Sequence, residues 1–441
     1  MRRERGGMPV LASLFVLLLA ACTPEAGPGE AACHVGIYAA GDQLIDLSPL
    51  SAGGLRWRTL DGETGSLSQA EDGLWAGVAG WTADAHPARF DLGACGSEAI
   101  TVSGLDAGHP TATRVSLVIE ETRFAGAGVE LAGRLVLPPG EGPFPLAVLV
   151  HGSGDYSALD YDFMQRMLPA RGVAVLVYDK RGTGTSTGEY TQDFALLAAD
   201  AAAALDEARR LAGNRIEAAG YFGASQGGWV APRAAMRSDP DFVVVTYGLA
   251  VGPAEEDRLE VVYALREAGY SEADVAAASE VAAVTGRLMA TRFREGGREL
   301  ARLKREHGGE PWFEAIEGEF SRDLLRYPLW LVRLAWPFVD RGTPWGHDPA
   351  PALDALDIPV LWLLAGSDAE APSTSTQAIL ERRRSQGQDI DIVLYPDADH
   401  GMRLFRTTEG GERLYTRYVP GYFQTVADWI LNEAGTAPTG H

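Results

Sequence analysis

Beyond residue 113, short apolar segments alternate with longer segments that have polar and apolar faces. The segment 144–150 (FPLAVLV) is apolar throughout, which is typical of a strand buried on both faces of a parallel sheet. This alternation predicts an α/β fold with a mostly parallel, doubly wound sheet covered by helices on both faces. The predicted core strands are 144–150, 173–178, 216–222, 242–251, 358–365 and 390–395. Segments 113–124 and 129–138 alternate like an antiparallel pair, and helices are predicted up to 171, over 193–212 and over 412–432.

Two parts of the chain depart from this alternation. Residues 33–106 consist of short apolar pieces between turns rich in Gly and Asp, which predicts a small β-rich module. This module holds no cluster of catalytic residue types, so we interpret it as accessory. Residues 255–347 lack strand-like runs and predict several helices inserted between two core strands, which favours a cap. The main domain is expected to span 113–435.

The N-terminus has the pattern of an export signal. A positively charged start precedes an apolar run over 10–21, which is too short to cross a bilayer but suits the core of a signal peptide. The run ends in Leu-Ala-Ala-Cys22, which resembles the lipobox of bacterial lipoproteins. That resemblance implies a signal peptide over 1–21, lipidation of Cys22, a tether over 22–32, and a cell-envelope lipoprotein on the periplasmic side of the outer membrane. The alternative is an ordinary signal peptide with Cys22 incidental. No transmembrane helix is predicted.

Charge and cysteine count narrow the choice of partners. The chain of 441 residues has 60 acidic and 38 basic side chains, a net charge of −22 that disfavours nucleic acid. Three cysteines are present. With Cys22 lipidated in an oxidising compartment, Cys33 and Cys95 remain and are expected to form a disulfide. A pair of unbonded thiols is the alternative.

Two segments fit the G-x-S-x-G pattern of a nucleophilic serine. In 223–227, Ser225 directly follows an apolar strand and precedes a plausible helix, as this turn requires. In 184–188, Ser186 lies in a loop rich in Gly and Thr. We therefore predict Ser225 as the nucleophile.

A serine hydroxyl needs a base, and the base needs a carboxylate that orients it. Among the eight histidines, His400 follows the last core strand. Asp368 follows the strand 358–365, so both are expected at the carboxyl edge of the sheet, where ligands bind in open α/β folds. The other carboxylates considered are Asp257, Glu370, Asp397 and Asp399.

The negative oxygen of an acyl-transfer intermediate needs backbone N–H donors. One donor is expected from Gln226, the residue after the nucleophile. The second is expected from Ser153, or otherwise Gly154, in the small-residue turn after strand 144–150. His151 in this turn is interpreted as structural.

Together these motifs resemble the α/β-hydrolase superfamily, within it the esterases and serine aminopeptidase-like hydrolases. The resemblance rests on His-Gly-Ser-Gly at 151–154, Tyr-Asp-Lys-Arg-Gly-Thr-Gly at 178–184 and Gly-Ala-Ser-Gln-Gly-Gly at 223–228, and it covers 113–435. It implies the order nucleophile, acid, base that Ser225, Asp368 and His400 follow. Many relatives have Pro and a nearby Arg where this chain has Asp155 and Tyr156. Asp179 and Arg181 are expected to form a structural network in their loop.

The leading hypothesis is a carboxylic ester hydrolase that forms an acyl-enzyme on Ser225, without a metal or cofactor, and acts on a small-molecule ester or amide. An aminopeptidase or amidase with the same triad is the alternative, in which Glu255, Glu256 or Asp257 would hold the substrate amine. A non-enzymatic envelope lipoprotein is a third hypothesis. The cap is rich in aromatic residues, with eight between 312 and 345, and these predict either its own core or an apolar acyl pocket above Ser225. No feature of the sequence predicts an oligomeric state.

Overall fold

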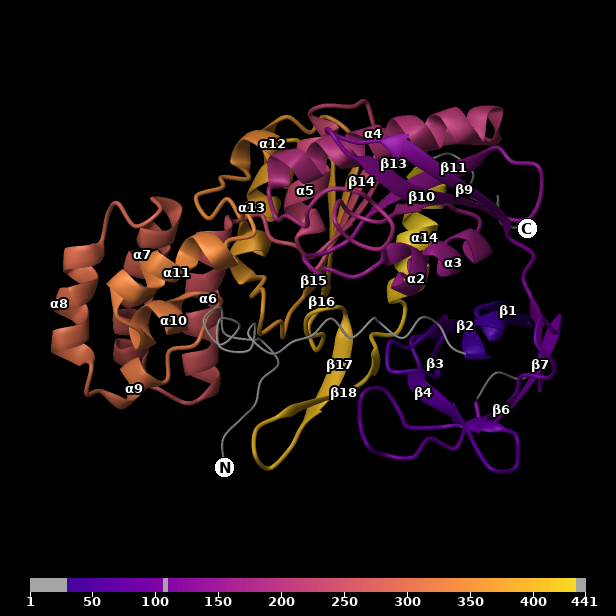
Figure 1. Ribbon diagram of the computed structural model, residues 1–441, viewed down its shortest axis with the longest axis horizontal. Coiled ribbons are helices and arrows are strands. Elements are labelled where there is room, and N and C mark those ends of the chain that lie inside the picture. Colours follow the sequence, from indigo (N-terminus) through magenta and orange to yellow (C-terminus); the bar gives the residue numbers. More distant parts are fainter. Residues whose placement is uncertain (1–29, 106–109, 434–441) are drawn as a thin grey trace.

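The computed structural model describes residues 30–105 and 110–433. Its centre is an eight-stranded sheet in the order β16-β15-β14-β13-β11-β12-β10-β9 (Figure 1). Strands β11 to β16 run parallel, and β9 and β10 add an antiparallel edge. The strands are β9 Val118–Ala125, β10 Glu130–Leu137, β11 Phe144–Val150, β12 Ala174–Tyr178, β13 Ile216–Ala224, β14 Val243–Thr246, β15 Val360–Ala365 and β16 Ile390–Tyr395. The predicted α/β-hydrolase fold is confirmed.

Helices cover both faces of the sheet, which explains the continuous apolar strands. In β11, Leu146 and Val148 join one buried cluster, while Ala147 and Leu149 join the cluster on the opposite face. The first face is covered by α4 Phe194–Ala212, α5 Gly227–Ala235, α12 Ala350–Asp354 and α13 Thr374–Ser385. The second is covered by α2 Ala158–Tyr161, α3 Met164–Met167 and α14 Tyr422–Glu433. Short 3-10 turns are η2 Pro169–Arg171 and η3 Gly213–Arg215.

Six helices between β14 and β15 form the cap, which has an apolar cluster of its own. They are α6 Pro253–Glu267, α7 Glu272–Ala290, α8 Gly297–His307, α9 Pro311–Glu314, α10 Ser321–Arg326 and α11 Leu329–Val339. Of the eight aromatic residues between 312 and 345, Trp330 and Phe338 are exposed, and the other six (Trp312, Phe313, Phe320, Tyr327, Trp336 and Trp345) belong to that cluster or pack against it.

The N-terminal module is a closed antiparallel barrel around Trp57 and Phe90. Its strands are β1 Gly36–Ala40, β2 Gln43–Pro49, β3 Leu55–Thr59, β4 Thr64–Gln69, β5 Trp75–Ala76, β6 Arg89–Asp91, β7 Ala99–Ser103 and β8 Thr111–Arg114. Because β8 pairs with β1 and β7, the barrel extends beyond residue 106, and the strand predicted over 113–124 is divided between barrel and sheet. Cys33, in the 3-10 helix η1 Glu30–His34, forms a disulfide with Cys95.

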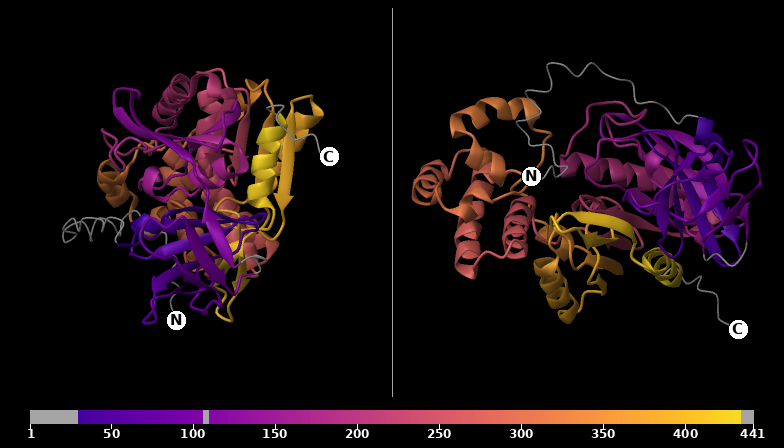
Figure 2. Two further views of the ribbon diagram at one scale, coloured as in Figure 1. Left: turned by 90° about the vertical axis from the view of Figure 1, so that its right-hand side faces the viewer. Right: turned by 90° about the horizontal axis from the view of Figure 1, so that it is seen from below.

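The helix predicted over 412–432 is wrong in its first part. Residues Arg413–Tyr418 form strand β18, which pairs with β17 Arg403–Thr407, and α14 begins only at Tyr422. This hairpin also holds the barrel, since the N–H of Trp81 donates to Tyr415 O and that of Tyr418 donates to Gly62 O. Contacts between segments that are far apart in the sequence produce no periodic pattern within either segment, so the strand could not be predicted. Cap and barrel lie on opposite sides of the hairpin in both Figure 1 and the right view of Figure 2.

The predicted signal peptide over 1–21, Cys22 and most of the tether lie outside the described residues. The last tether positions, 30–32, belong to η1. Within the described ranges, every helix is too short or too polar to span a bilayer.

Candidate active site

Ser225 lies on a sharp turn between β13 and α5. Its backbone is left-handed, with φ of +53°, and its N–H donates to Thr246 O at 3.0 Å. Small neighbours make this turn sterically feasible: a Cβ at Gly227 would clash with the carbonyl of Val150, and one at Gly223 would clash with the carbonyl of Gly227. The turn therefore places the Ser225 side chain at the carboxyl edge of the sheet.

The structure brings Ser225, His400 and Asp368 into one chain of hydrogen bonds. His400 Nε2 lies 3.0 Å from Ser225 Oγ, and His400 Nδ1 lies 2.9 Å from Asp368 Oδ2. The other oxygen of the buried Asp368 accepts the N–H groups of Glu370 and Ala371 at 3.0 and 2.7 Å. These bonds fix the carboxylate against the ring, a geometry in which the imidazole can accept a proton from the serine.

The other carboxylates have different positions. Asp399 forms an ion pair with Arg413 at 2.7 Å and accepts the Tyr415 hydroxyl at 2.8 Å. Asp257 points into the cap and accepts the N–H of Phe320 at 2.9 Å, and burial raises its pKa to about 6. Asp397 is exposed. Glu370 is the nearest competitor, since its Oε1 lies 3.7 Å from His400 Nε2.

Carboxylates determine the charge state of His400. Burial lowers the pKa of the imidazole, but Asp368 and then Glu370 raise it, together with Glu256 on α6, so that the pKa reaches about 9. The pKa of Glu256 is in turn well above its usual range because of burial and the neighbouring Glu319. The site thus strongly stabilises an imidazolium.

The predicted oxyanion-binding N–H groups lie free beside the nucleophile. Within the described chain, the N–H groups of Gln226, Ser153 and Gly154 donate to no other group. A Cβ on the preceding residue, Gly152, would lie 3.3 Å from Ser225 Cβ, so this turn runs against the nucleophile. Both kinds of donor therefore flank Ser225, as stabilisation of an oxyanion requires.

Two side chains hold the carbonyl groups of this turn. Lys180 Nζ donates to Gly152 O at 2.7 Å, and the Tyr190 hydroxyl donates to Ser153 O. In a planar trans peptide the C=O and the following N–H point in opposite directions. Lys180 therefore orients the N–H of Ser153, and Tyr190 orients that of Gly154. Sequence reasoning gave neither side chain this role; the signals for Lys180 were its place in the motif at 178–184 and its being one of two lysines in the chain.

The remaining candidates lie outside this chain of hydrogen bonds. His151 is buried, and neither ring nitrogen has a hydrogen-bond partner in the described structure; burial lowers its pKa well below the usual range. Ser186 donates to Asp179 O at 2.7 Å. Asp179 and Arg181 belong to separate networks, because Arg181 pairs with Asp200 at 2.7 Å while Asp179 accepts from Ser157 at 2.9 Å.

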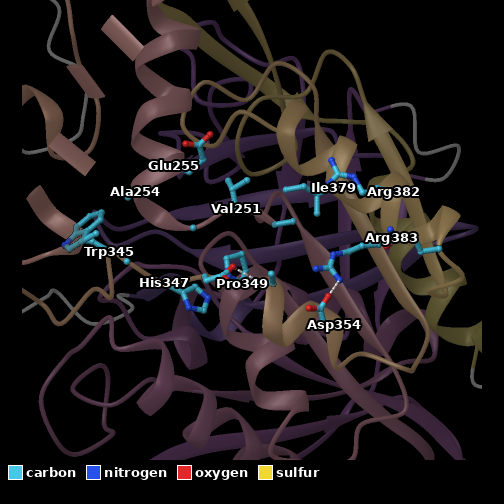
Figure 3. A pocket seen from close by; sticks show the side chains of 17 residues that line it. Val251, Ala254, Glu255, Trp345, His347, Pro349, Asp354, Ile379, Arg382 and Arg383 are labelled. Carbon is cyan, nitrogen blue, oxygen red and sulfur yellow. Dashed lines mark hydrogen bonds and ion pairs between the residues drawn. The ribbon is translucent and has the colours of Figure 1, made fainter. Parts of the chain in front are cut away.

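Ser225 and His400 open into a cavity of about 590 Å³. Its aromatic walls come from Trp81, Tyr156, Tyr161, Phe163, Phe222, Tyr247, Tyr418 and Tyr422. None of the eight aromatic residues between 312 and 345 lines it, so of the two alternatives the structure supports packing within the cap and not an acyl pocket above Ser225. A second cavity, of about 650 Å³, lies between α6, α13 and the segment around His347 and contains no triad residue (Figure 3).

Comparisons with known proteins agree with this architecture. The Alpha/beta hydrolase family matches residues 147–409, more than half of the chain. Esterase FrsA of Enterobacter sp. is 38% identical over 101 residues, which are 22% of this chain and 24% of that protein. The chain thus spans about a quarter of the length of the curated relatives it matches.

The solved structures compared with this chain have lower sequence identity to it than the curated relatives have. An esterase of Pyrococcus furiosus has 15% identity and a TM-score of 0.42, over 64% of this chain and 84% of that one. An acylaminoacyl peptidase of Pyrococcus horikoshii has 13% identity and a TM-score of 0.44, over 91% and 56%.

Proposed function

Because the chain belongs to the alpha/beta hydrolase family, we propose that it hydrolyses carboxylic esters through an acyl-enzyme formed on Ser225. The hydrogen-bond chain from Ser225 Oγ through His400 to Asp368 carries this proposal. The esterase relatives that match part of the chain support esters, rather than amides, as the substrates.

In the proposed reaction, Ser225 Oγ attacks the ester carbonyl while His400 Nε2 accepts the hydroxyl proton. The carbonyl oxygen becomes an oxyanion that accepts hydrogen bonds from the N–H groups of Gln226 and Ser153. As the intermediate collapses, the imidazolium donates its proton to the leaving alkoxide, and an acyl-enzyme remains. A water molecule, deprotonated by His400, then cleaves the acyl-enzyme. Asp368 stabilises the imidazolium in both steps.

The experiment is hydrolysis of short p-nitrophenyl esters by the Ser225→Ala variant. We expect a loss of at least about 10³-fold in kcat, because triad members act as a unit. Ser186→Ala is the matched control and should retain the parent activity, and a fluorophosphonate probe should label the parent but not Ser225→Ala. Equal turnover by Ser225→Ala and the parent would exclude the assignment.

An aminopeptidase or amidase is the second candidate, and one carboxylate without an ion pair among the described residues, that of Glu256, favours it. Of the residues predicted to hold a substrate amine, Glu255 pairs with Arg258 and Asp257 faces the cap, whereas Glu256 acts on His400 and has no cationic side-chain partner in the described structure. An aminoacyl p-nitroanilide should be compared with the matching aminoacyl ester. The compared quantity is the rate enhancement, the catalysed rate divided by the uncatalysed rate of the same substrate. A larger rate enhancement for the anilide than for the ester would favour this candidate.

We also propose that the chain is exported and anchored through a lipid on Cys22, as its lipobox-like N-terminus suggests. In a bacterial host, an alkyne fatty acid should label the parent and not Cys22→Ser. Equal labelling and equal membrane recovery of both proteins would contradict this.

A further inference from the structure

The cavity at Ser225 has one wall from the N-terminal barrel. Besides Ser225 and His400, its lining includes Arg56 and Trp81 of the barrel and Arg403 at the start of β17. A part of the chain without a cluster of catalytic residue types therefore lies against the space that a substrate would occupy.

Arg56 is a buried cation without a counter-charge. Its side chain extends from β3, its guanidinium lies 4.4 Å from the centre of the Trp81 ring, and Nη1 donates to Gly80 O at 2.8 Å. Only 8% of the residue is exposed. Within the described residues, no carboxylate lies within 4.0 Å of it, and its other N–H groups have no acceptor. A buried charge in this state is costly unless an anion compensates it.

Arg403 brings a second uncompensated guanidinium to the same indole ring. It lies 5.6 Å from the centre of the Trp81 ring, and its Nε donates to the backbone oxygen of His400 at 2.8 Å. In the described part of the chain, no carboxylate forms an ion pair with Arg403. Two guanidinium groups without an ion pair in the described chain thus have the Trp81 ring as a common neighbour, and the Arg403 group, which also lies over the Tyr415 ring, is hydrogen-bonded to His400.

Other charged groups of the cavity leave this pair uncompensated. Arg58 also lines it, but Arg58 is paired with the buried Asp46 at 3.0 Å. Glu370 and Asp162 are the carboxylates of the lining, and neither forms an ion pair with Arg56 or Arg403. Burial, followed by repulsion from Arg58 and then Arg403, lowers the pKa of Arg56 to about 10, while Tyr418 acts in the opposite direction.

We propose that Arg56, together with Arg403, binds a carboxylate group carried by the ester substrate, so that the barrel selects anionic substrates. This inference rests on the proposed ester hydrolysis and adds the substrate class. A guanidinium offers paired N–H donors that match the two oxygens of a carboxylate. Since Glu370 and Asp162 line the same cavity, a singly charged group is favoured over a doubly charged one.

The test compares two substrates of equal acyl length, mono-p-nitrophenyl adipate, which carries a carboxylate, and p-nitrophenyl hexanoate, which does not. The measured quantity is the ratio of their kcat/KM values, corrected for hydrolysis in the presence of Ser225→Ala. In the parent this ratio should favour the adipate ester. Arg56→Met should lower the ratio at least tenfold, Arg56→Lys should retain part of the preference, and Arg89→Met, an exposed arginine of the barrel, should leave the ratio unchanged.

Using a ratio within one variant separates recognition from folding, since a partly unfolded enzyme loses both activities together. A parent that hydrolyses the hexanoate ester without favouring the adipate ester would overturn the inference and leave the proposed function intact. An unchanged ratio in Arg56→Met would do the same. Absence of Ser225-dependent hydrolysis of either ester would instead refute the proposed function.

Discussion

The imidazole of His400 lies among carboxylates from three different segments: Asp368 after β15, Glu370 two residues later, and Glu256 on the cap helix α6. Only Asp368 is bonded to the ring nitrogen that faces away from Ser225. Glu370 and Glu256 act through charge, so they change the pKa of the base without occupying its hydrogen-bonding positions.

Replacing Glu370 by Gln should shift the acidic limb of the pH profile to lower pH. The neutral imidazole is the proton acceptor, so kcat/KM for a neutral ester should rise with pH through the His400 pKa of about 9. Glu370 raises that pKa, and its neutralisation lowers it, so a larger fraction of enzyme is active at pH 7. We expect a gain of about threefold there, from a partly screened interaction near 4 Å. Glu409→Gln, in an exposed loop, is the control; a limb unmoved by Glu370→Gln would contradict this account.

Lys180→Met should reduce kcat by about tenfold and change KM little, because Lys180 orients the N–H of Ser153 through the Gly152 carbonyl and does not touch the substrate. Burial lowers the pKa of Lys180 to about 7, yet the neutral amine still donates a hydrogen bond. The other lysine gives a matched control, since Lys304 donates to Tyr327 O within the cap. A rise in KM at constant kcat would show that Lys180 acts on binding instead.

Among single residues, the sequence identifies those whose position follows from the pattern of the neighbouring residues in the chain. Ser225, Asp368 and His400 each follow a strand end, and strand ends are readable from apolar runs. Arg56 and Arg403 had no such signal, because their relation exists only after the barrel docks against β17 and β18. Lys180 was also missed, since its partner carbonyl belongs to a different loop.

Among the strands, those covered by helices on both faces of the sheet could be predicted best from the sequence. Strand β11 has the predicted bounds 144–150, since every side chain of a doubly covered strand is apolar. The segment 413–418 is partly exposed and four of its six residues are Arg or Tyr, so its apolar pattern did not distinguish strand from helix. Its state is determined by pairing with β17 and by contacts with the barrel.

A buried ionic cluster joins the barrel to α3, and its loss should be costly. Asp46 of β2 accepts from Arg58 of β3 at 3.0 Å and from Arg166 of α3 at 2.6 Å. Asp46→Asn leaves two buried guanidinium groups without a counter-charge, so we expect the free energy of unfolding to fall by about 3 kcal/mol. Urea denaturation followed by tryptophan fluorescence measures this.

The control is Asp428→Asn, which removes the partner of Arg171 in an exposed ion pair and should cost less than about 1 kcal/mol. Equal losses in the two variants would mean that the Asp46 cluster does not contribute more than a surface ion pair.

For the whole molecule, the sequence predicts the parts better than their arrangement. A β-rich module, a capped α/β domain and their order along the chain follow from local patterns. The module is interpreted as accessory because its sequence holds no cluster of catalytic residue types. Its position is determined instead by side chains such as Ile37, Leu44 and Leu60, which join the apolar cluster between the sheet and α14. Such packing between surfaces of separate domains has no signature within either segment.

The barrel occupies one uninterrupted stretch at the start of the described chain, whereas Ser225, Asp368 and His400 all come from the later domain. In the proposed mode of recognition, Arg56 is thereby encoded in a different portion of the gene from the triad, whereas Arg403 belongs to the same portion as the triad. Mutation or recombination confined to the first portion could change which substrates are hydrolysed while the geometry of the catalytic residues stays the same. In descendants of this protein, the sequence of the barrel rather than the G-x-S-x-G turn would then record the history of substrate choice.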